Sequence, residues 1–326
     1  MADAVDAYLQ LTEAQARAQW QSIHQRVPLA RQVAFLPVET LLSYALFYLL
    51  NPHRFGGGNI DQVPPEVKAL AATFKRSAGS LTNKMLNLDG SRANSARHEP
   101  ELFIRLQEPG RFEPLYRRIL KAARLEGFGE AQVPDFLGAL DGDEPIALLG
   151  QEELGPVQVA SALDEMFHQQ RQLGAAFGFT ETETSRLVEQ RVRLAQHRFA
   201  RAVLTNYRWT CGFCGFAPGR LRGYGLLIAS HVKPWAKSDD KERADVANGI
   251  CACPTHDSAF DAGLLTVAAD LQIRRAGVLE RHMVDNASLN RMFGAPAMRG
   301  ALLVPAAAER PRSEFLTFHQ ANVFRG

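Results

Sequence analysis

The feature that most constrains this chain is a set of two short spacings in its second half. Two residues separate Cys211 from Cys214, and two separate Cys253 from His256. Each pair can bind one ion from a single turn of chain, and a Cys-x-x-Cys followed at a distance by a Cys-x-x-His makes a good tetrahedral zinc set. Residues 211–256 are therefore expected to fold around one structural Zn²⁺, which holds the segment between the pairs in a compact frame.

Cysteine usage supports a metal site over disulfides. All four cysteines lie between residues 211 and 253 of a 326-residue chain, and this is no disulfide framework for a protein of that size. Clustered thiols instead indicate metal binding in a reducing compartment. A redox role for Cys211 and Cys214 is disfavoured, because no βαβ pattern surrounds them and the second pair would stay unexplained. Cys251 is then a spare thiol, expected to be buried.

Length and charge set broader limits. A chain of 326 residues can form two domains, each with its own core. The net charge of +2 gives no global basic field, so any nucleic-acid surface must be local. The longest apolar run, residues 41–50, is shorter than the roughly 20 residues that cross a bilayer, and the N-terminus lacks the basic-then-apolar opening of an export signal. We expect a cytoplasmic protein with no membrane partner.

Residues 1–135 predict a helical domain, interpreted as a DNA-recognition domain. Residues 74–88 predict a helix end, a tight turn at Gly79 and a second helix capped by Ser80, which is the pattern of a helix-turn-helix. Residues 136–180 are expected to form a linker and a helical connector. Further helices are expected over 9–20, 38–50, from Pro64-Pro65-Glu66 onward, over 103–125 and over 160–177.

Residues 181–326 predict one long helix followed by a mixture of short strands, a loop and a helix. A long helix is expected over 182–207, and a short strand that ends at His231 follows. A charged loop covers 233–247, a helix is expected from Asn248 to Asp261, and residues 264–267 return as a strand. A strand, an irregular crossover and a helix around one metal centre form a ββα arrangement. The predicted fold class is α+β, mostly α.

These segments resemble the HNH endonuclease superfamily, in particular restriction-type nucleases. The likeness spans Phe199 to Val267 and is carried by Ala229-Ser230-His231-Val232-Lys233-Pro234-Trp235, Asn248-Gly249-Ile250 and His256-to-Leu264 in that order and spacing. Residues 315–324 resemble the closing helix often seen after such domains. Residues 77–88 bear a fainter likeness to a module found upstream. The resemblance implies a C-terminal ββα-metal nuclease domain, here 181–326, that acts on DNA with a divalent cation.

His231 is the first candidate for chemistry. Hydrolysis of a phosphodiester needs a water stripped of a proton near neutral pH, and a neutral imidazole suits that task. By resemblance His231 is the general base, and Asn248 orients it through its amide. A surface or capping histidine is the alternative for His231. For Asn248 the alternative is a helix N-cap, for which Asn is among the best residues, and both roles can hold at once.

The resemblance leaves two metal assignments open. In the first, Cys211, Cys214, Cys253 and His256 bind zinc, while Asp257 and Asp261 face Mg²⁺ or another divalent cation. These two carboxylates are four residues apart, hence on one helical face, and suit a hard ion. In the second assignment, His256 is itself a ligand of the catalytic metal, and Cys251 or Asp257 completes the zinc set. The first is favoured because Cys253 and His256 share the spacing of the other pair.

One position departs from the family pattern. Many members carry Asp or His immediately before the catalytic histidine, where it supplies a metal ligand, and here that residue is Ser230. The cation would then rely on Asp257, Asp261, water and the phosphate, or on another acid such as Asp239 or Asp245.

Cations near these motifs are candidates for phosphate contacts, although such runs are more often solvated faces. In the helical domain a plain core or surface helix is the alternative. The candidates are Arg198, Arg201, Lys233 and Lys237 in the nuclease region, and Lys75, Arg76 and Lys84 in the helical domain.

The expected function is metal-dependent hydrolysis of DNA, in restriction or another defence against foreign or modified DNA. A zinc-stabilised DNA-binding protein that has lost cleavage is one alternative, and a non-specific or RNA-directed nuclease is another. Since an HNH domain cuts one strand per site, cleavage of both strands would favour a homodimer.

Overall fold

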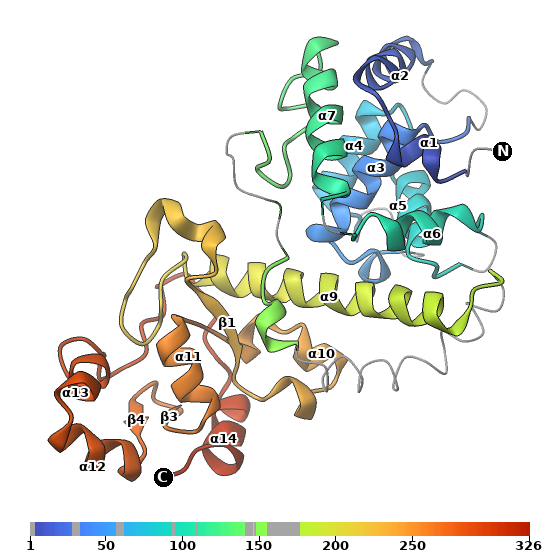
Figure 1. Ribbon diagram of the computed structural model, residues 1–326. Coiled ribbons are helices and arrows are strands. Elements are labelled where there is room, and N and C mark those ends of the chain that lie inside the picture. The colour runs from blue at the N-terminus through green and yellow to red at the C-terminus, as the bar shows by residue number, and fades with distance from the viewer. Residues whose placement is uncertain are drawn as a thin grey trace. The chain divides into compact units, whose positions relative to one another are not determined.

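The computed structural model describes residues 4–27, 33–56, 62–92, 95–108, 110–140, 146, 148–154 and 177–326 (Figure 1). They form two compact units. Unit 1 comprises 1–146 and 162–194, and unit 2 comprises 147–161 and 195–326. Helix α9 (Glu181–Asn206) belongs to unit 1 through Leu194 and to unit 2 beyond it. None of the described helices has the length and apolar character needed to span a membrane.

Unit 1 is helical, as predicted. Trp20, Phe74 and Tyr116 are fully buried at its centre, and α2 lies beside α7 (Figure 1). Its helices are α1 (Asp6–Leu9), α2 (Glu13–Gln25), α3 (Pro37–Ala45), α4 (Pro65–Thr73), α5 (Ala78–Leu88), α6 (His98–Arg105) and α7 (Phe112–Leu125), with the 3-10 turns η1 (Leu46–Tyr48) and η2 (Pro52–Arg54).

Two expected helices are each divided in two. The pattern over 9–20 breaks because Thr12 caps α2 through a reciprocal pair of hydrogen bonds with Gln15. The pattern over 103–125 breaks between α6 and α7, where Gly110 has a φ of 75°. The helix expected over 160–177 lies outside the described residues, apart from Phe177.

The predicted helix-turn-helix needs a correction at its turn. Helix α5 starts at Ala78 with Ser77 as its cap, so Gly79 and Ser80 lie inside the helix, and the turn itself lies at Lys75, whose φ is 54°. The Ser77 hydroxyl accepts the Ser80 backbone N–H at 3.1 Å. Helix α5 contacts α3, α4 and α6 and buries Leu81, Met85 and Leu88. It is a core helix of unit 1.

Unit 2 contains the predicted ββα arrangement. Strand β1 (Ile228–His231) pairs antiparallel with β2 (Gly249–Ala252), and His231 lies opposite Gly249. Helix α11 (Pro254–Asp261) packs against both strands. The remaining elements are η4 (Gln151–Glu153), η5 (Gly219–Tyr224), η6 (Trp235–Lys237), α10 (Asp240–Arg243), η7 (Val246–Asn248), the pair β3 (Leu265–Val267) and β4 (Ile273–Arg275), and α12 (Gly277–Asp285), α13 (Ala287–Phe293) and α14 (Ser313–Asn322).

The helix expected from Asn248 to Asp261 is wrong in its first half. Residues 249–252 are a fully buried strand, and the helix begins only at Pro254. Pairing with β1 satisfies the backbone of this segment, so tertiary contacts override its helical pattern. Pro254 marks the start of this helix in the sequence, since proline suits the first helical position.

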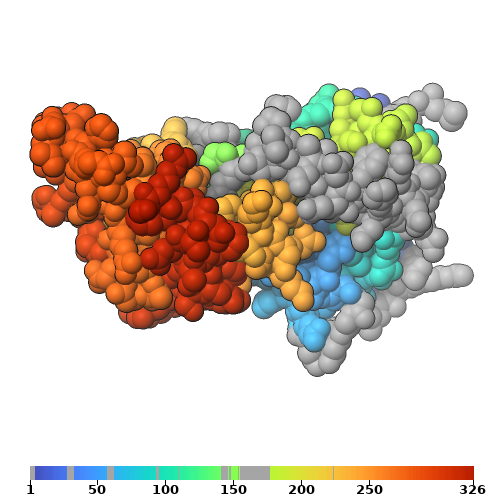
Figure 2. Space-filling model, turned by 90° about the horizontal axis from the view of Figure 1, so that it is seen from below, coloured from blue at the N-terminus to red at the C-terminus, as the bar shows by residue number. Residues whose placement is uncertain are grey.

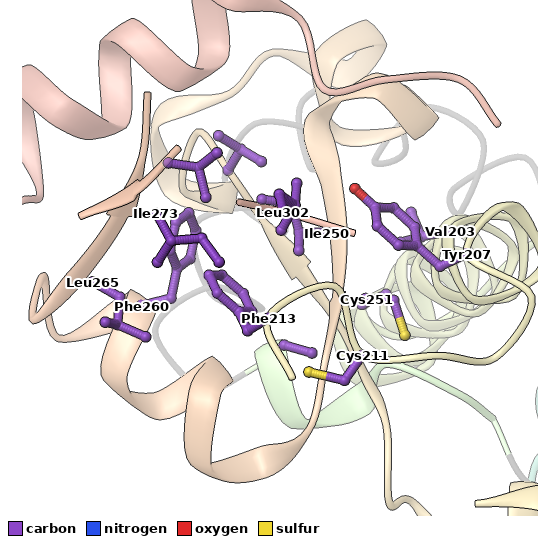
Figure 3. Packing of buried hydrophobic residues seen from close by; sticks show 14 of the residues in the cluster. Val203, Tyr207, Cys211, Phe213, Ile250, Cys251, Phe260, Leu265, Ile273 and Leu302 are labelled. Atoms are coloured by element: carbon purple, nitrogen blue, oxygen red, sulfur yellow. The ribbon is translucent and has the colours of Figure 1, made fainter. Parts of the chain in front are cut away.

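The hydrophobic core of unit 2 contains buried side chains of β1, β2 and α11 and of the neighbouring elements α9, β3 and α14 (Figure 3). Phe213 and Phe260 meet there with 5.7 Å between ring centroids, and Ile250 and Leu265 are fully buried in the same cluster. Cys251 is buried in this cluster, as expected.

The C-terminal helix closes one side of unit 2. Figure 2 shows α14, in dark red, beside the golden-orange segment around α10. Arg312 connects the two regions, because its backbone N–H donates to the Ala247 carbonyl at 3.1 Å and its guanidinium pairs with Asp245 at 2.7 Å.

Candidate metal and catalytic centre

The two spaced pairs meet at one point. Each of the four residues offers one ligand atom, and these atoms all lie within 4.8 Å of one another: the Sγ atoms of Cys211, Cys214 and Cys253 and a ring nitrogen of His256. The Nδ1 atom of His256 lies 3.1 Å from Cys253 Sγ and 3.9 Å from Cys211 Sγ. Among the described residues, this is the one group of three or more His, Cys, Asp or Glu side chains that could hold an ion, and Cys251 is not part of it.

The donor set suits a tetrahedral ion. Zinc bond lengths to sulfur and nitrogen place an S and an N ligand about 3.6 Å apart on a tetrahedral edge. The two distances from His256 Nδ1, 3.1 and 3.9 Å, bracket that value. Three sulfurs and one imidazole nitrogen therefore match a closed structural zinc site.

Local backbone geometry brings the ligands together. The Gly215 N–H donates to the Cys211 carbonyl at 2.8 Å, which closes the turn between the first two cysteines. The Gly212 N–H donates to the Cys251 carbonyl at 2.7 Å and attaches this turn to β2. Cys253 is the N-cap of α11, so His256 lies in the first turn of that helix. Both pairs are thus held from short segments joined to the same strand.

Contacts within the group shift the pKa values of three of its members. Hydrogen bonds from Cys211 and Cys214 lower the pKa of Cys253, against the effect of burial. Contacts with Cys214 and Cys253, together with burial, raise the pKa of Cys211. Burial opposes ionisation of His256, yet the contacts with Cys214 and Cys253 raise its pKa to about 9. A bound cation would displace protons from these ligands.

His231 is held on two sides at the end of β1. It is 4% exposed, and its ring lies on the Phe199 ring of α9 with 3.9 Å between centroids and 12° between planes. Its Nε2 atom lies 3.2 Å from the Arg243 carbonyl oxygen. Since a carbonyl only accepts, Nε2 carries the proton, and in the neutral ring Nδ1 carries the lone pair. That tautomer is the one a general base acting through Nδ1 requires.

Asn248 does not begin a helix, so the N-cap interpretation is wrong. It ends the turn η7 and is fully buried. Its Oδ1 accepts the Lys233 N–H at 2.8 Å, and its Nδ2 donates to the carbonyls of Lys233 and Glu242 at 3.3 and 3.1 Å and to Ser238 Oγ at 3.3 Å. These bonds fix the crossover loop one residue before Arg243, whose carbonyl binds His231.

The two expected carboxylate ligands differ in exposure. Asp257 lies in α11 and is 8% exposed, whereas Asp261 ends the helix and is exposed. Ser230 is fully buried. The substitute acids have other contacts: Asp239 caps α10, and Asp245 pairs with Arg312 at 2.7 Å.

The four cations proposed to contact phosphate in the nuclease region differ in exposure and in ion pairing. Lys237 is exposed, and Arg198 and Arg201 are half-buried. Lys233 forms an ion pair with Glu242 at 2.7 Å.

In unit 1 the three proposed contacts have internal partners. Lys75 Nζ donates to the His24 carbonyl at 2.7 Å. Arg76 binds Glu39 at 2.7 Å, and Lys84 binds Glu99. Any phosphate contact by these side chains would have to break those bonds.

The sequence did not predict two residues that hold the site in place, Phe199 and His319. Phe199 was part of the family likeness but had no assigned role, and nothing local to it indicates a stack on His231, a residue 32 positions away. His319 of α14 is 1% exposed and stacks on Phe260, with Nε2 3.2 Å from the Phe260 carbonyl and Nδ1 2.9 Å from Thr266 Oγ1. It therefore anchors α14 to the helix that carries Asp257 and Asp261.

Comparison with known proteins adds one finding. No curated protein shows significant similarity to the chain. The family model described as HNH endonuclease matches residues 211–268, the segment that holds the four clustered residues, His231 and Asn248. This match supports placing residues 211–268 in the HNH endonuclease superfamily, a family of nucleases.

Proposed function

We propose that this protein hydrolyses phosphodiester bonds of DNA with the aid of a divalent cation, and that His231 is the general base. The observation that carries the proposal is the hydrogen bond between His231 Nε2 and the Arg243 carbonyl, because it leaves Nδ1 as the basic nitrogen. The matched family is one of nucleases, which supports hydrolysis as the reaction.

In this mechanism His231 Nδ1 takes a proton from a water molecule that attacks the phosphorus. The proton makes the ring an imidazolium, and the Arg243 carbonyl then stabilises the positive charge through the Nε2–H. Phe199 holds the ring plane, so the base meets the water in a constant orientation. By family resemblance the products carry 5′-phosphate and 3′-hydroxyl ends.

Asp257 and Asp261 are the proposed holders of Mg²⁺ or a similar cation. When bound, such a cation supplies charge stabilisation to the pentacoordinate phosphate and the departing 3′ oxygen. Cys211, Cys214, Cys253 and His256 hold a structural Zn²⁺ in the proposal, because their geometry matches a closed tetrahedral site.

The proposed setting is the cytoplasm, where free thiols stay reduced and can bind metal. The proposed substrate is foreign or modified DNA, in restriction or a related defence. Two copies of the chain would cut the two strands of a duplex.

A cleavage assay with a matched histidine control tests the proposal. Supercoiled plasmid is incubated with the full chain and Mg²⁺, Mn²⁺ or Ni²⁺. His231→Ala is expected to abolish nicking, while His282→Ala, at an exposed histidine of α12, leaves it unchanged. Zinc content and circular dichroism confirm that both variants are folded. Equal activity of the two variants would overturn the assignment of the base.

The alternatives give different results in the same assay. A binding protein that has lost cleavage would retain DNA without cutting it in any of the three metals. A non-specific nuclease would digest RNA and random DNA at comparable rates.

A further inference from the structure

Charge is segregated along this nearly neutral chain. Residues 190–238 contain no Asp or Glu, although the whole chain has 35 of them against 37 Lys and Arg. The same stretch holds nine cations: Arg191, Arg193, Arg198, Arg201, Arg208, Arg220, Arg222, Lys233 and Lys237. It runs from α9 through the cysteine turn and β1 to the crossover loop, so the rest of the chain is net acidic.

Four of these cations are exposed and have no ion pair with an acid in the part of the chain that the structure describes: Arg208, Arg220, Arg222 and Lys237. The three arginines among them lie close together in the sequence. By contrast, Lys233 binds Glu242 at 2.7 Å, and Arg193 binds Glu189 at 2.7 Å. The three arginines lie before and within the segment 215–225, here called the knuckle loop, which leads into β1 (Figure 1).

The knuckle loop also exposes large apolar side chains. Phe216, Leu221 and Tyr224 are 42%, 52% and 67% exposed, and Phe216 and Tyr224 are the aromatic residues among the large exposed hydrophobic side chains of the described chain. The Arg222 guanidinium lies 5.6 Å from the ring centroid of Trp209. Arginine and exposed aromatic rings thus share one short surface segment.

The backbone before the loop is held in an unusual conformation. Arg208 and Trp209 have φ values of 52° and 56°, in the left-handed region that non-glycine residues seldom adopt. Their N–H groups donate to the carbonyls of Thr205 and Leu204 at 2.9 and 2.8 Å, which ends α9. This turn places Trp209 at the rim of the core, half-buried and next to Arg222.

We infer that the knuckle loop, together with Arg208 and Trp209, is a binding site for an unpaired stretch of the nucleic-acid substrate. Its arginines bind phosphates, and Phe216, Tyr224 and Trp209 stack on bases. Opposite charge favours a polyanion over an apolar protein partner. Base faces are accessible for stacking only where the strand is unpaired, so the aromatic rings favour single-stranded or opened DNA over intact duplex.

The position of the loop separates this site from the catalytic residues. Ile228 begins the strand that follows the loop, and His231 ends it. Six residue steps separate the end of the loop at Gly225 from His231, a span of at most about 20 Å, or roughly six nucleotide steps along a B-DNA strand. The loop therefore contacts the substrate within about six nucleotides of the cut. It determines which DNA is held and does not take part in the chemistry. The inference rests on the proposed nuclease function for its choice of ligand.

Binding is tested in the full chain carrying His231→Ala, so that cleavage does not disturb the measurement. Fluorescence anisotropy gives the Kd for a labelled 20-nucleotide oligo(dT) and for a labelled 20-base-pair duplex. The double variant Phe216→Ala/Tyr224→Ala is expected to weaken oligo(dT) binding by roughly 10- to 100-fold, the size of one or two lost stacking contacts, and to change duplex binding less than threefold. Tyr224→Phe should retain wild-type binding.

The arginines are tested separately from the rings. Arg220→Gln/Arg222→Gln should weaken both ligands and reduce the slope of log Kd against log salt by about 1 to 2, since two phosphate contacts are removed. The matched control is Val284→Ala/Met292→Ala, which removes exposed apolar side chains of α12 and α13 in the same unit. That control should bind as the parent does, and all variants should retain zinc.

The inference is overturned if the aromatic double variant, folded and with zinc bound, binds oligo(dT) as the parent does. It is also overturned if both ligands weaken equally, or if light scattering shows a dimer that this variant dissolves, because the loop would then bind a second copy. Failure of the proposed function has a different signature: a wild-type chain that cuts nothing but binds oligo(dT) through the loop would refute the nuclease and retain the site.

Discussion

The ring of His231 lies flat on the ring of Phe199, with 3.9 Å between centroids and 12° between planes. One ring ends strand β1 and the other comes from helix α9. The stack and the hydrogen bond from Nε2 to the Arg243 carbonyl together fix the imidazole in plane and in rotation.

Phe199→Leu should lower the cleavage rate about 10- to 100-fold while DNA affinity stays within twofold, because a small displacement of His231, the proposed general base, has that effect on rate. Single-turnover cleavage and anisotropy measure the two quantities. Phe315→Leu, at another buried phenylalanine of unit 2, is the control and should retain the rate. Equal rates for the two variants would mean that the stack serves only packing.

Asn248→Ala should destabilise unit 2 by about 2–4 kcal/mol, since it removes several buried hydrogen bonds and leaves their partners unsatisfied. Urea unfolding measures the change. The comparison is Asn322→Ala, at an exposed position that donates one bond to the Phe318 carbonyl at 2.9 Å. A loss of activity with unchanged stability would show instead that the Asn248 amide acts on the substrate.

Cys214→Ser should lose zinc and unfold unit 2, whereas Cys251→Ser should retain one zinc per chain, because Cys251 lies outside the ligand group. Elemental analysis and circular dichroism measure both effects. Zinc loss on replacing Cys251 would support the alternative ligand set.

His256→Cys distinguishes the two metal assignments. A thiolate can replace the imidazole in a structural zinc site, so the variant should keep both zinc and cleavage. If His256 were a ligand of the catalytic cation, zinc would stay and cleavage would disappear.

The stability of unit 2 should fall with acid through His319. Burial lowers the pKa of this histidine to about 4, although its hydrogen bond to the Phe260 carbonyl opposes the shift. The folded pKa is below the unfolded value of about 6.5. The unfolded state therefore binds more protons between these values, and stability present above about pH 6.5 is lost as the pH falls towards 4.

Between pH 7 and 5.5 this effect amounts to about 1 kcal/mol. Urea unfolding at the two pH values should show it in the parent and not in His319→Gln. His197, whose pKa burial and the charges of Arg201 and Arg198 lower to about 3, contributes in the same direction and stays in both proteins. The difference between parent and variant therefore isolates His319, and an identical slope in both would refute the assignment.

Short-range sequence patterns correctly predicted the elements whose deciding contacts lie close together in the sequence. Cys211 with Cys214, and Cys253 with His256, are each joined by one turn, so their spacing predicted a group of four side chains that the structure brings together as a possible metal-binding site. The strand that ends at His231 and the helix that begins at Pro65 likewise follow from short-range features. The family likeness of residues 199–267 rests on the order of these same short motifs.

Tertiary structure decided the rest, because the deciding partners lie far apart in the chain. Asn248 precedes a strand and does not begin an α-helix, since β1 supplies the backbone hydrogen bonds of residues 249–252. Gly249 is required there for a reason that no local pattern contains: a Cβ at this position would lie 2.3 Å from Val203 of α9. Arg76 and Lys84 bind Glu39 and Glu99 inside unit 1. Sequence identified which residues can do chemistry, and long-range pairing of charges, rings and backbone determined how each one is held.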